Sequence, residues 1–257
     1  MSRQGFSVEE IIKTAADLKM EGIDWVTTYG RNPKELKKMS VDAGLEVACH
    51  TFFAEKLLAG DNKWLDEVKQ SIDDAVELGA PIIMIPTGVN EEMPRRDSRY
   101  FWIDALKQIA PFAEQAGITL TIENYPGKDS AFVTAADFFE AKVQVPQLKL
   151  TYDDGNAASG EDPVNSLNLC KDDIVHVHFK DWYIQDQSEE GYREMLNGKY
   201  FKPALIGQGD IPTSACLKAL KKIGYDGYIN IEYEGNAIPA NKANELAITF
   251  LKNIMKE

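Results

Sequence analysis

The chain has 257 residues, a net charge of −13 and a hydrophobic content of 44%. Such a composition can build a large core, but it offers no basic surface for nucleic acid or for an anionic membrane. No segment approaches the roughly 20 apolar residues of a transmembrane helix, and no apolar signal-peptide core opens the sequence. We therefore expect a cytoplasmic protein without a nucleic-acid or membrane partner, and we expect its three scattered cysteines, Cys49, Cys170 and Cys216, to be reduced.

Helical and β-rich segments alternate along the whole chain. The first is an amphipathic helix from Ser7 to Glu21. Further helical patterns separate the β-rich segments, and several of them end in glycine, which is favoured just past a helix C-terminus. Seven strands are predicted, at 23–29, 45–53, 81–88, 118–125, 148–154, 174–181 and 227–234.

The repeated β-then-α order predicts parallel strands joined by crossover helices. The chain has the size of a (β/α)8 TIM barrel, and we predict one such domain over residues 1–257. Because a helix comes first, either the barrel lacks its first strand or the sequence begins downstream of the natural start. An open doubly wound sheet is disfavoured, since no glycine-rich GxGxxG loop follows the first strand.

Alternation of side chains gives four of the predicted strands one apolar face and one polar face. The apolar faces suit the helix-packed outside of a barrel, and each polar face ends in a residue that can bind a metal. These residues are Glu123, Asp153, His178 and Glu232. They should meet at the mouth of the barrel, at the carboxyl ends of the strands, where active sites of this fold lie. Asp154 and Glu234 are rival candidates, but Asp154 falls on the other face and Glu234 lies further out.

Three carboxylates in one desolvated place predict a bound cation, because without one they would repel each other and take up protons. One imidazole with three carboxylates is a mostly hard-oxygen set, which favours Mn²⁺ or Mg²⁺, with Co²⁺ or Zn²⁺ as alternatives. Each residue alone also has a purely structural interpretation, as a helix cap, an ion-pair partner or a core histidine. Their recurrence on four strands favours the metal site.

Four further residues are candidates for substrate binding. His50 should point into the mouth, unless it is a core histidine bonded to a backbone carbonyl. Asn156 could donate to a substrate oxygen or cap the following helix. Lys180 could polarise a substrate oxygen or pair with Asp181, and Trp182 is a predicted wall of the pocket.

Two features of the same region complete the prediction. His176 should lie one layer deeper than the metal-binding histidine, so packing or support of that residue is expected rather than ligation. The long connection at 183–205 is either a lid or binding loop, or a solvated surface excursion.

Five motifs carry a resemblance to a known family. They are IENYPG around Glu123, YDDGN at 152–156, HVHFKD at 176–181, IGQGDIP at 206–212 and YINIEYE around Glu232. In their order and spacing the chain resembles the sugar-phosphate isomerase/epimerase group of xylose-isomerase-like TIM barrels, which includes ketose 3-epimerases, hydroxypyruvate isomerase and inosose dehydratase. The resemblance implies that Glu123, Asp153, His178 and Glu232 bind the metal, and that Glu123 and Glu232 exchange protons with the substrate.

The implied function is that of a divalent-metal-dependent isomerase or epimerase. It would act on a keto-sugar or sugar phosphate through a metal-stabilised enediolate that carboxylates form and reprotonate. An inosose-type dehydratase on the same site is the alternative, and a non-catalytic sugar-binding barrel is a third interpretation. An endonuclease-IV-like hydrolase is disfavoured by the acidity and by the presence of only three histidines. The expected partner is a small carbohydrate, and homo-oligomerisation stays open. Asn156 replaces a histidine that many epimerases use, and no basic cluster marks a phosphate site.

Overall fold

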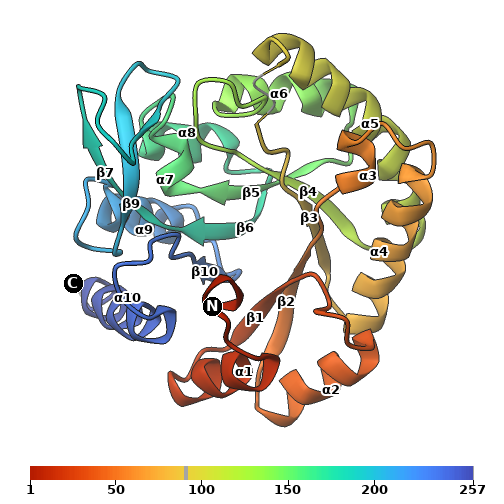
Figure 1. The fold of residues 1–257 in the computed structure, drawn as a ribbon, viewed down its shortest axis with the longest axis horizontal. Coiled ribbons are helices and arrows are strands. Elements are labelled where there is room, and N and C mark those ends of the chain that lie inside the picture. Colours follow the sequence, from red (N-terminus) through yellow and green to blue (C-terminus); the bar gives the residue numbers. More distant parts are fainter. Residues whose placement is uncertain (90–91, 257) are drawn as a thin grey trace.

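Parallel strands form a barrel-like sheet at the centre of the molecule (Figure 1). The computed structural model describes residues 1–89 and 92–256. The sheet has the order β1-β2-β3-β4-β5-β6-β10, so neighbours along the chain are neighbours in the barrel. The TIM-barrel prediction is confirmed. The strands are β1 (Gly22–Val26), β2 (Glu46–Thr51), β3 (Ile82–Ile85), β4 (Thr119–Glu123), β5 (Lys149–Asp153), β6 (Ile174–Phe179) and β10 (Ile229–Ile231).

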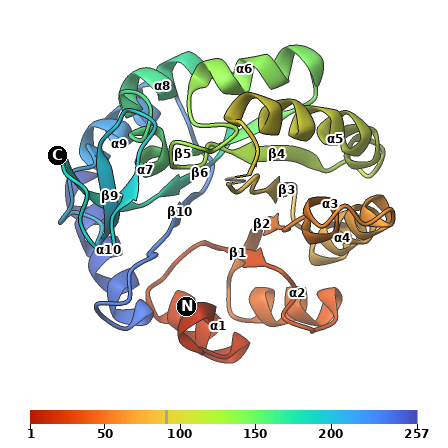
Figure 2. The same ribbon diagram turned by 45° about the horizontal axis from the view of Figure 1, so that its top comes forward.

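Helices surround the sheet, as Figure 2 shows from a second direction. Local sequence fixes where they begin: Ser7 and Glu10 form a reciprocal capping box at the first long helix, and Asn32 caps the second ahead of a proline. The longer helices are α1 (Val8–Asp17), α2 (Pro33–Asp42), α4 (Trp64–Leu78), α5 (Arg95–Gln115), α6 (Ala135–Gln144), α8 (Pro163–Cys170), α9 (Thr213–Lys222) and α10 (Ala240–Ile254). Short helical turns are η1 (Ser2–Gln4), α3 (Glu55–Leu58) and α7 (Asp154–Ala157).

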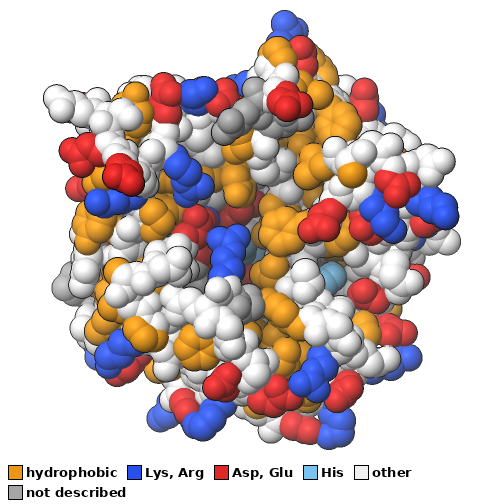
Figure 3. All heavy atoms as spheres, viewed as in Figure 1, with side chains coloured by type: hydrophobic (Ala, Val, Ile, Leu, Met, Phe, Trp, Pro, Cys, Tyr) orange, Lys and Arg blue, Asp and Glu red, His pale blue; other side chains and the backbone are white. Residues whose placement is uncertain are grey.

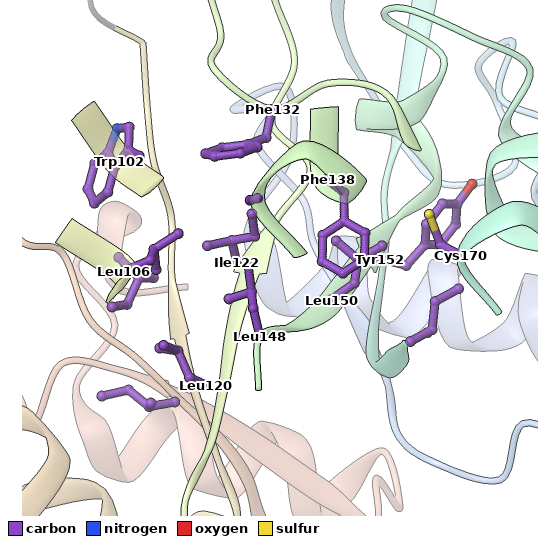
Figure 4. Close-up of a cluster of buried hydrophobic side chains, with 14 of the residues drawn as sticks. Trp102, Leu106, Leu120, Ile122, Phe132, Phe138, Leu148, Leu150, Tyr152 and Cys170 are labelled. Carbon is purple, nitrogen blue, oxygen red and sulfur yellow. The ribbon is translucent and has the colours of Figure 1, made fainter. Parts of the chain in front are cut away.

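The main core lies between the outer face of the sheet and the helices (Figure 4). Ile122 of β4 and Leu150 of β5 face outward and are fully buried with Trp102 of α5 and Phe138 of α6. Burying one such side chain contributes roughly 1.5–3 kcal/mol. The alternation predicted for β4 and β5 is therefore present, and it turns the polar side chains of both strands into the barrel.

The barrel has a seam between β10 and β1, which form no ladder within the described residues. Side chains bridge the seam instead. The Tyr228 ring lies against Gly22, and its hydroxyl donates to Glu46 at 2.8 Å. The Gln4 side chain donates to the Ile238 carbonyl at 3.2 Å. A strand that preceded α1 would pair at this seam, which agrees with the predicted lack of a first strand.

The connection after β6 is an ordered antiparallel sheet. It consists of β7 (Asp181–Gln185), β8 (Arg193–Glu194) and β9 (Tyr200–Ala204). The Trp182 and Phe201 rings pack edge to face, 4.9 Å apart, and Met195 joins them in a small core. The segment is therefore more than a solvated excursion.

The three cysteines are free and buried. Within the described ranges, no helix combines the length and apolarity that crossing a membrane requires.

Candidate active site

The four predicted metal-binding residues meet inside the barrel. One donor atom from each of four residues lies within 4.8 Å of the others, and these residues are Glu123, Asp153, His178 and Glu232. They come from the ends of β4, β5 and β6 and from the residue after β10. We refer to them below as the donor quartet. Figure 3 shows a hollow at the centre of one face, with acidic and basic side chains inside it.

The imidazole of His178 is the contact point for two members of the quartet. Its Nδ1 lies 2.8 Å from Glu123 Oε1 and 3.1 Å from Glu232 Oε1. Burial alone would lower the pKa of His178, but the charge of Glu232 and hydrogen bonds to carboxylates raise it well above its usual value. The side chain of Glu232 is 28% exposed, whereas that of Glu123 is 5% exposed. Glu232 is thus the carboxylate of this pair that a substrate reaches more easily.

Lys180 places its ammonium against the quartet. Its Nζ lies 2.6 Å from Glu232 Oε2, 3.2 Å from Asp153 Oδ2 and 3.1 Å from Glu234 Oε1. Burial would lower the pKa of Lys180, but these carboxylates raise it well above its usual value, so the side chain is charged. Lys180 therefore does not pair with Asp181, which accepts backbone N–H groups instead.

Burial and the neighbouring charges shift the pKa values of two quartet carboxyl groups, Asp153 and Glu232, in opposite directions. Burial, together with the nearby carboxylates, raises the pKa of Asp153 well above its usual value. Burial acts in the same direction on Glu232, but Lys180 and His178 lower the pKa of that carboxyl well below its usual value. Asp153 Oδ2 is buried and has no hydrogen-bond partner among the described residues, although the lysine ammonium lies near it. A divalent cation fits this donor set, because it would satisfy that oxygen and remove the repulsion.

Asp24 is a residue of the site that sequence reasoning missed. It lies on β1, and its Oδ2 accepts from His176 Nε2 at 2.7 Å and contacts His178 Nε2 at 3.3 Å. Burial would raise the pKa of Asp24, but the two histidines lower it to about 2. One signal was available: an aspartate between Ile23 and Trp25 points away from the helix-packed face of its strand.

The predicted orientation of His50 is wrong. The register between β1 and β2 shifts between Ile23 and Asp24, which leaves one extra residue, Ala48, in β2. Such a β-bulge reverses the alternation of the side chains that follow it. His50 therefore shares the helix-facing side with Trp25, and its Nδ1 donates to the Trp25 carbonyl at 3.0 Å. This is the core histidine of the alternative interpretation.

Asn156 and Trp182 lie close to the site but are deeply buried. Asn156 follows Asp153 in α7, and its backbone N–H donates to Asp153 Oδ1 at 2.7 Å. Neither polar atom of the Asn156 side chain has a hydrogen-bond partner among the described residues. The Trp182 ring lies 5.6 Å from Lys180 Nζ, and its indole nitrogen also lacks a partner in the described part of the chain.

The two rival carboxylates lie outside the quartet. Asp154 accepts from the backbone N–H groups of Gly155 and Lys180, and burial raises its pKa to about 7. Glu234 joins Lys180 to Arg193 of β8, whose Nη2 lies 3.2 Å from Glu234 Oε2. The antiparallel sheet of β7, β8 and β9 is thereby connected to the site through one carboxylate.

Known proteins are similar to this chain in sequence and in fold. The sequence profile of the xylose isomerase-like TIM barrel family matches residues 12–254. Inosose dehydratase of Geobacillus thermodenitrificans is 25% identical over 250 residues, which cover 91% of this chain and 84% of the relative. The crystal structure of D-psicose 3-epimerase from Clostridium cellulolyticum H10 is similar with a TM-score of 0.74 at 14% identity, over 97% of this chain and 94% of the epimerase. The crystal structure of the zinc-bound IolI protein is similar with a TM-score of 0.76 at 17% identity, over 95% of this chain and 91% of IolI.

The resemblance inferred from the five motifs is thus confirmed by a match over nearly the whole chain. The strand order and the position of the site at the carboxyl ends of the strands agree with it. The chain belongs to the xylose isomerase-like TIM barrel family and is an enzyme of that family.

Proposed function

We propose that the protein is a divalent-metal-dependent enzyme that removes a proton from the carbon next to the ketone of a keto-cyclitol or keto-sugar. The observation that carries this proposal is the donor quartet, in which four strands bring three carboxylates and one imidazole to within 4.8 Å. The reaction needs a base beside the substrate and a positive charge beside its carbonyl oxygen, and the quartet with Lys180 supplies places for both.

Glu123, Asp153, His178 and Glu232 would hold the ion. Oxygen-rich donors favour Mn²⁺ or Mg²⁺, with Co²⁺ or Zn²⁺ as alternatives, and the zinc in the IolI structure supports a divalent metal in this fold. When bound, the ion would supply Lewis-acid stabilisation of the negative charge that develops on the carbonyl oxygen.

Glu232 is the proposed base. Its low pKa keeps it ionised, it is the more exposed glutamate of the quartet, and Lys180 Nζ holds one of its oxygens at 2.6 Å. Glu123 would act as the second proton-transfer group, since it approaches the same His178 nitrogen. The ammonium of Lys180 would donate to a substrate oxygen, and Trp182 and Asn156 would shape the pocket around it.

Dehydration is the first candidate reaction. Glu232 would take the proton from the carbon next to the ketone, and that electron pair would form a carbon–carbon double bond. Glu232 would pass this proton to the hydroxyl on the following carbon, which would leave as water while the ammonium of Lys180 donates a hydrogen bond to its oxygen. The relative named inosose dehydratase supports this outcome, and so does an ammonium placed 2.6 Å from the base.

Epimerisation or isomerisation is the second candidate. It needs two proton-transfer groups, one to remove the proton and one to return it to the other face or to the neighbouring carbon. The pairing of Glu123 and Glu232 on one histidine nitrogen favours it, as does the similar fold of D-psicose 3-epimerase.

Chromatographic separation of the products followed by mass spectrometry would test both candidates. The protein would be loaded with Mn²⁺ and incubated with an inosose and with a panel of ketoses. A product lighter by one water supports dehydration, and a new isomer of unchanged mass supports epimerisation or isomerisation. If no keto-polyol gives either product while the metal is bound, the proposed function is contradicted.

A further inference from the structure

Asp24 joins two histidines across the inside of the barrel. Its Oδ2 accepts a hydrogen bond from His176 Nε2 at 2.7 Å and faces His178 Nε2 at 3.3 Å. The side chain of Asp24 is 6% exposed and those of the histidines 1%. Its strand, β1, lies on the far side of the seam from β10, so this contact ties β1 to β6 through the interior.

The two nitrogens of the His178 ring have different partners. Nδ1 faces Glu123 and Glu232, which belong to the donor quartet, whereas Nε2 faces Asp24, which does not. A neutral imidazole carries its proton on one nitrogen and a lone pair on the other. A ring that gives the Nδ1 lone pair to a metal must therefore keep its proton on Nε2. There the N–H group faces Asp24, which can accept a hydrogen bond from it.

We propose that Asp24 is a positioning residue for the metal ligand His178. Its carboxylate accepts a hydrogen bond from the Nε2–H group, which fixes the tautomer and the orientation of the ring and directs the Nδ1 lone pair at the ion. A carboxylate behind a metal-binding histidine commonly has this role. The inference rests on the proposed metal site but not on the reaction catalysed there.

His176 has a part in the same arrangement. Its Nε2 holds Asp24 Oδ2, and its ring lies edge to face against His178 with centroids 5.1 Å apart. The carboxylate is thus held by a donor that is not itself part of the quartet. This explains why the chain places two histidines on alternate positions of one strand: one is a ligand, and the other fixes the carboxylate behind it.

A different use of the same residues must be separated from this one. Ligand atoms of Asp24, Cys49 and His176 also lie within 4.8 Å of one another, so a second ion bound there would make Asp24 a ligand rather than a positioning residue. Cys49 is the residue that distinguishes the two cases, because positioning of His178 does not require its thiol.

Mn²⁺ binding, measured by electron paramagnetic resonance, tests the inference. We expect one ion per wild-type chain and an affinity for Asp24→Asn that is roughly 10- to 100-fold lower. Cys49→Ala, the matched control at the paired position of β2, should bind one ion with wild-type affinity. Wild-type affinity in a folded Asp24→Asn, or an ion lost in Cys49→Ala, would overturn the inference. Absence of Mn²⁺ binding by the wild type would overturn the metal site itself.

Nitrogen NMR of the wild-type protein gives a result even if Asp24→Asn does not fold. The chain has three histidines, so ¹⁵N-labelled imidazoles give three sets of signals. With Mg²⁺ or Zn²⁺ bound, the proton of His178 should reside on Nε2, and its signal should lie downfield because of the hydrogen bond to a carboxylate. A proton on Nδ1 of His178 would overturn the inference.

Discussion

Lys180 is a cation fixed among carboxylates that a metal is expected to share. Replacing it with methionine leaves Asp153 and Glu232 without their buried partner, which should cost about 3–5 kcal/mol of folding free energy in the presence of a chelator. Added Mn²⁺ would neutralise the same carboxylates, so thermal unfolding should show a larger metal-induced rise in Tm for Lys180→Met than for the wild type.

Lys199→Met is the control for that experiment, because the side chain of Lys199 is 54% exposed and its carboxylate partner lies 3.7 Å away. It should change neither the Tm without metal nor the response to Mn²⁺ by more than a small amount. Equal responses of Lys180→Met and the wild type to Mn²⁺ would show that the ammonium and the ion do not act on the same carboxylates.

Which residues form the quartet could be predicted from the sequence, because regular alternation holds near the ends of β4, β5, β6 and β10. The contacts of Lys180 could not, since they depend on how far a flexible side chain reaches across the barrel. Asp24 was missed because its polar position in an apolar strand does not reveal that its partners are the histidines of β6.

At the scale of elements, the Asp181 carboxylate fixes the loop that leads into α9. It accepts backbone N–H groups of Gly207, Gly209 and Ile211 at 2.9–3.1 Å. A Cβ at Gly209 would lie 2.6 Å from the Trp182 carbonyl oxygen and would also overlap the carboxylate. Gly209→Ala should therefore lower the free energy of unfolding by roughly 2–3 kcal/mol, measured by urea denaturation.

Gly224→Ala provides the comparison. Gly224 has a φ of 75° but nothing within 4 Å of its Cβ position, so alanine there should cost only the backbone strain, about 1 kcal/mol. If Gly209→Ala lowers the free energy of unfolding no more than Gly224→Ala does, the loop can move away from Asp181 without cost.

Asp173, the residue before β6, ties that strand to its neighbours. Its Oδ1 lies 2.7 Å from Lys149 Nζ and 2.9 Å from Lys142 Nζ. Burial would raise the pKa of Asp173, but the two lysines lower it. A carboxyl with a lowered pKa in the folded state stabilises the protein above its unfolded pKa of about 3.9 and loses that effect as the pH falls toward the folded value.

Asp173→Asn should therefore reduce the free energy of unfolding by about 1 kcal/mol at pH 7, a value discounted for the partial exposure of the lysines. The difference from the wild type should shrink as the pH falls below about 4. The neighbouring Asp172 is exposed, so Asp172→Asn should have little effect at either pH. A difference that persists unchanged at pH 3 would contradict the ion-pair account.

Element boundaries show where sequence reasoning succeeds and where it fails. All seven strands of the barrel sheet overlap predicted segments, because each is a short apolar or alternating run between helical patterns. The error concerned β2, where the extra residue Ala48 reversed the side chains beyond it and turned His50 outward. A bulge depends on pairing with the neighbouring strand, so the alternation of β2 alone could not reveal it.

At the scale of the whole molecule, the barrel is held together across its seam by side chains rather than by a strand ladder in the described residues. The ring of Tyr228 packs against Gly22 of β1, and Asp24 reaches the histidines of β6 in the interior. The number of strands in the barrel sheet could be predicted from the chain order. The way the seam is bridged could not, because it depends on contacts between the two ends of the sequence.

Metal-dependent proton removal next to a ketone is the central claim, and hydrogen exchange measures it most directly. Proton NMR would follow a panel of ketoses and an inosose in D₂O with Mg²⁺-loaded protein. We predict that deuterium enters at the carbon next to the carbonyl of the true substrate, and that chelation of the metal or the substitution Glu232→Gln abolishes this exchange. If no keto-polyol gains deuterium at that carbon and none loses water while one ion is bound per chain, the claim is contradicted.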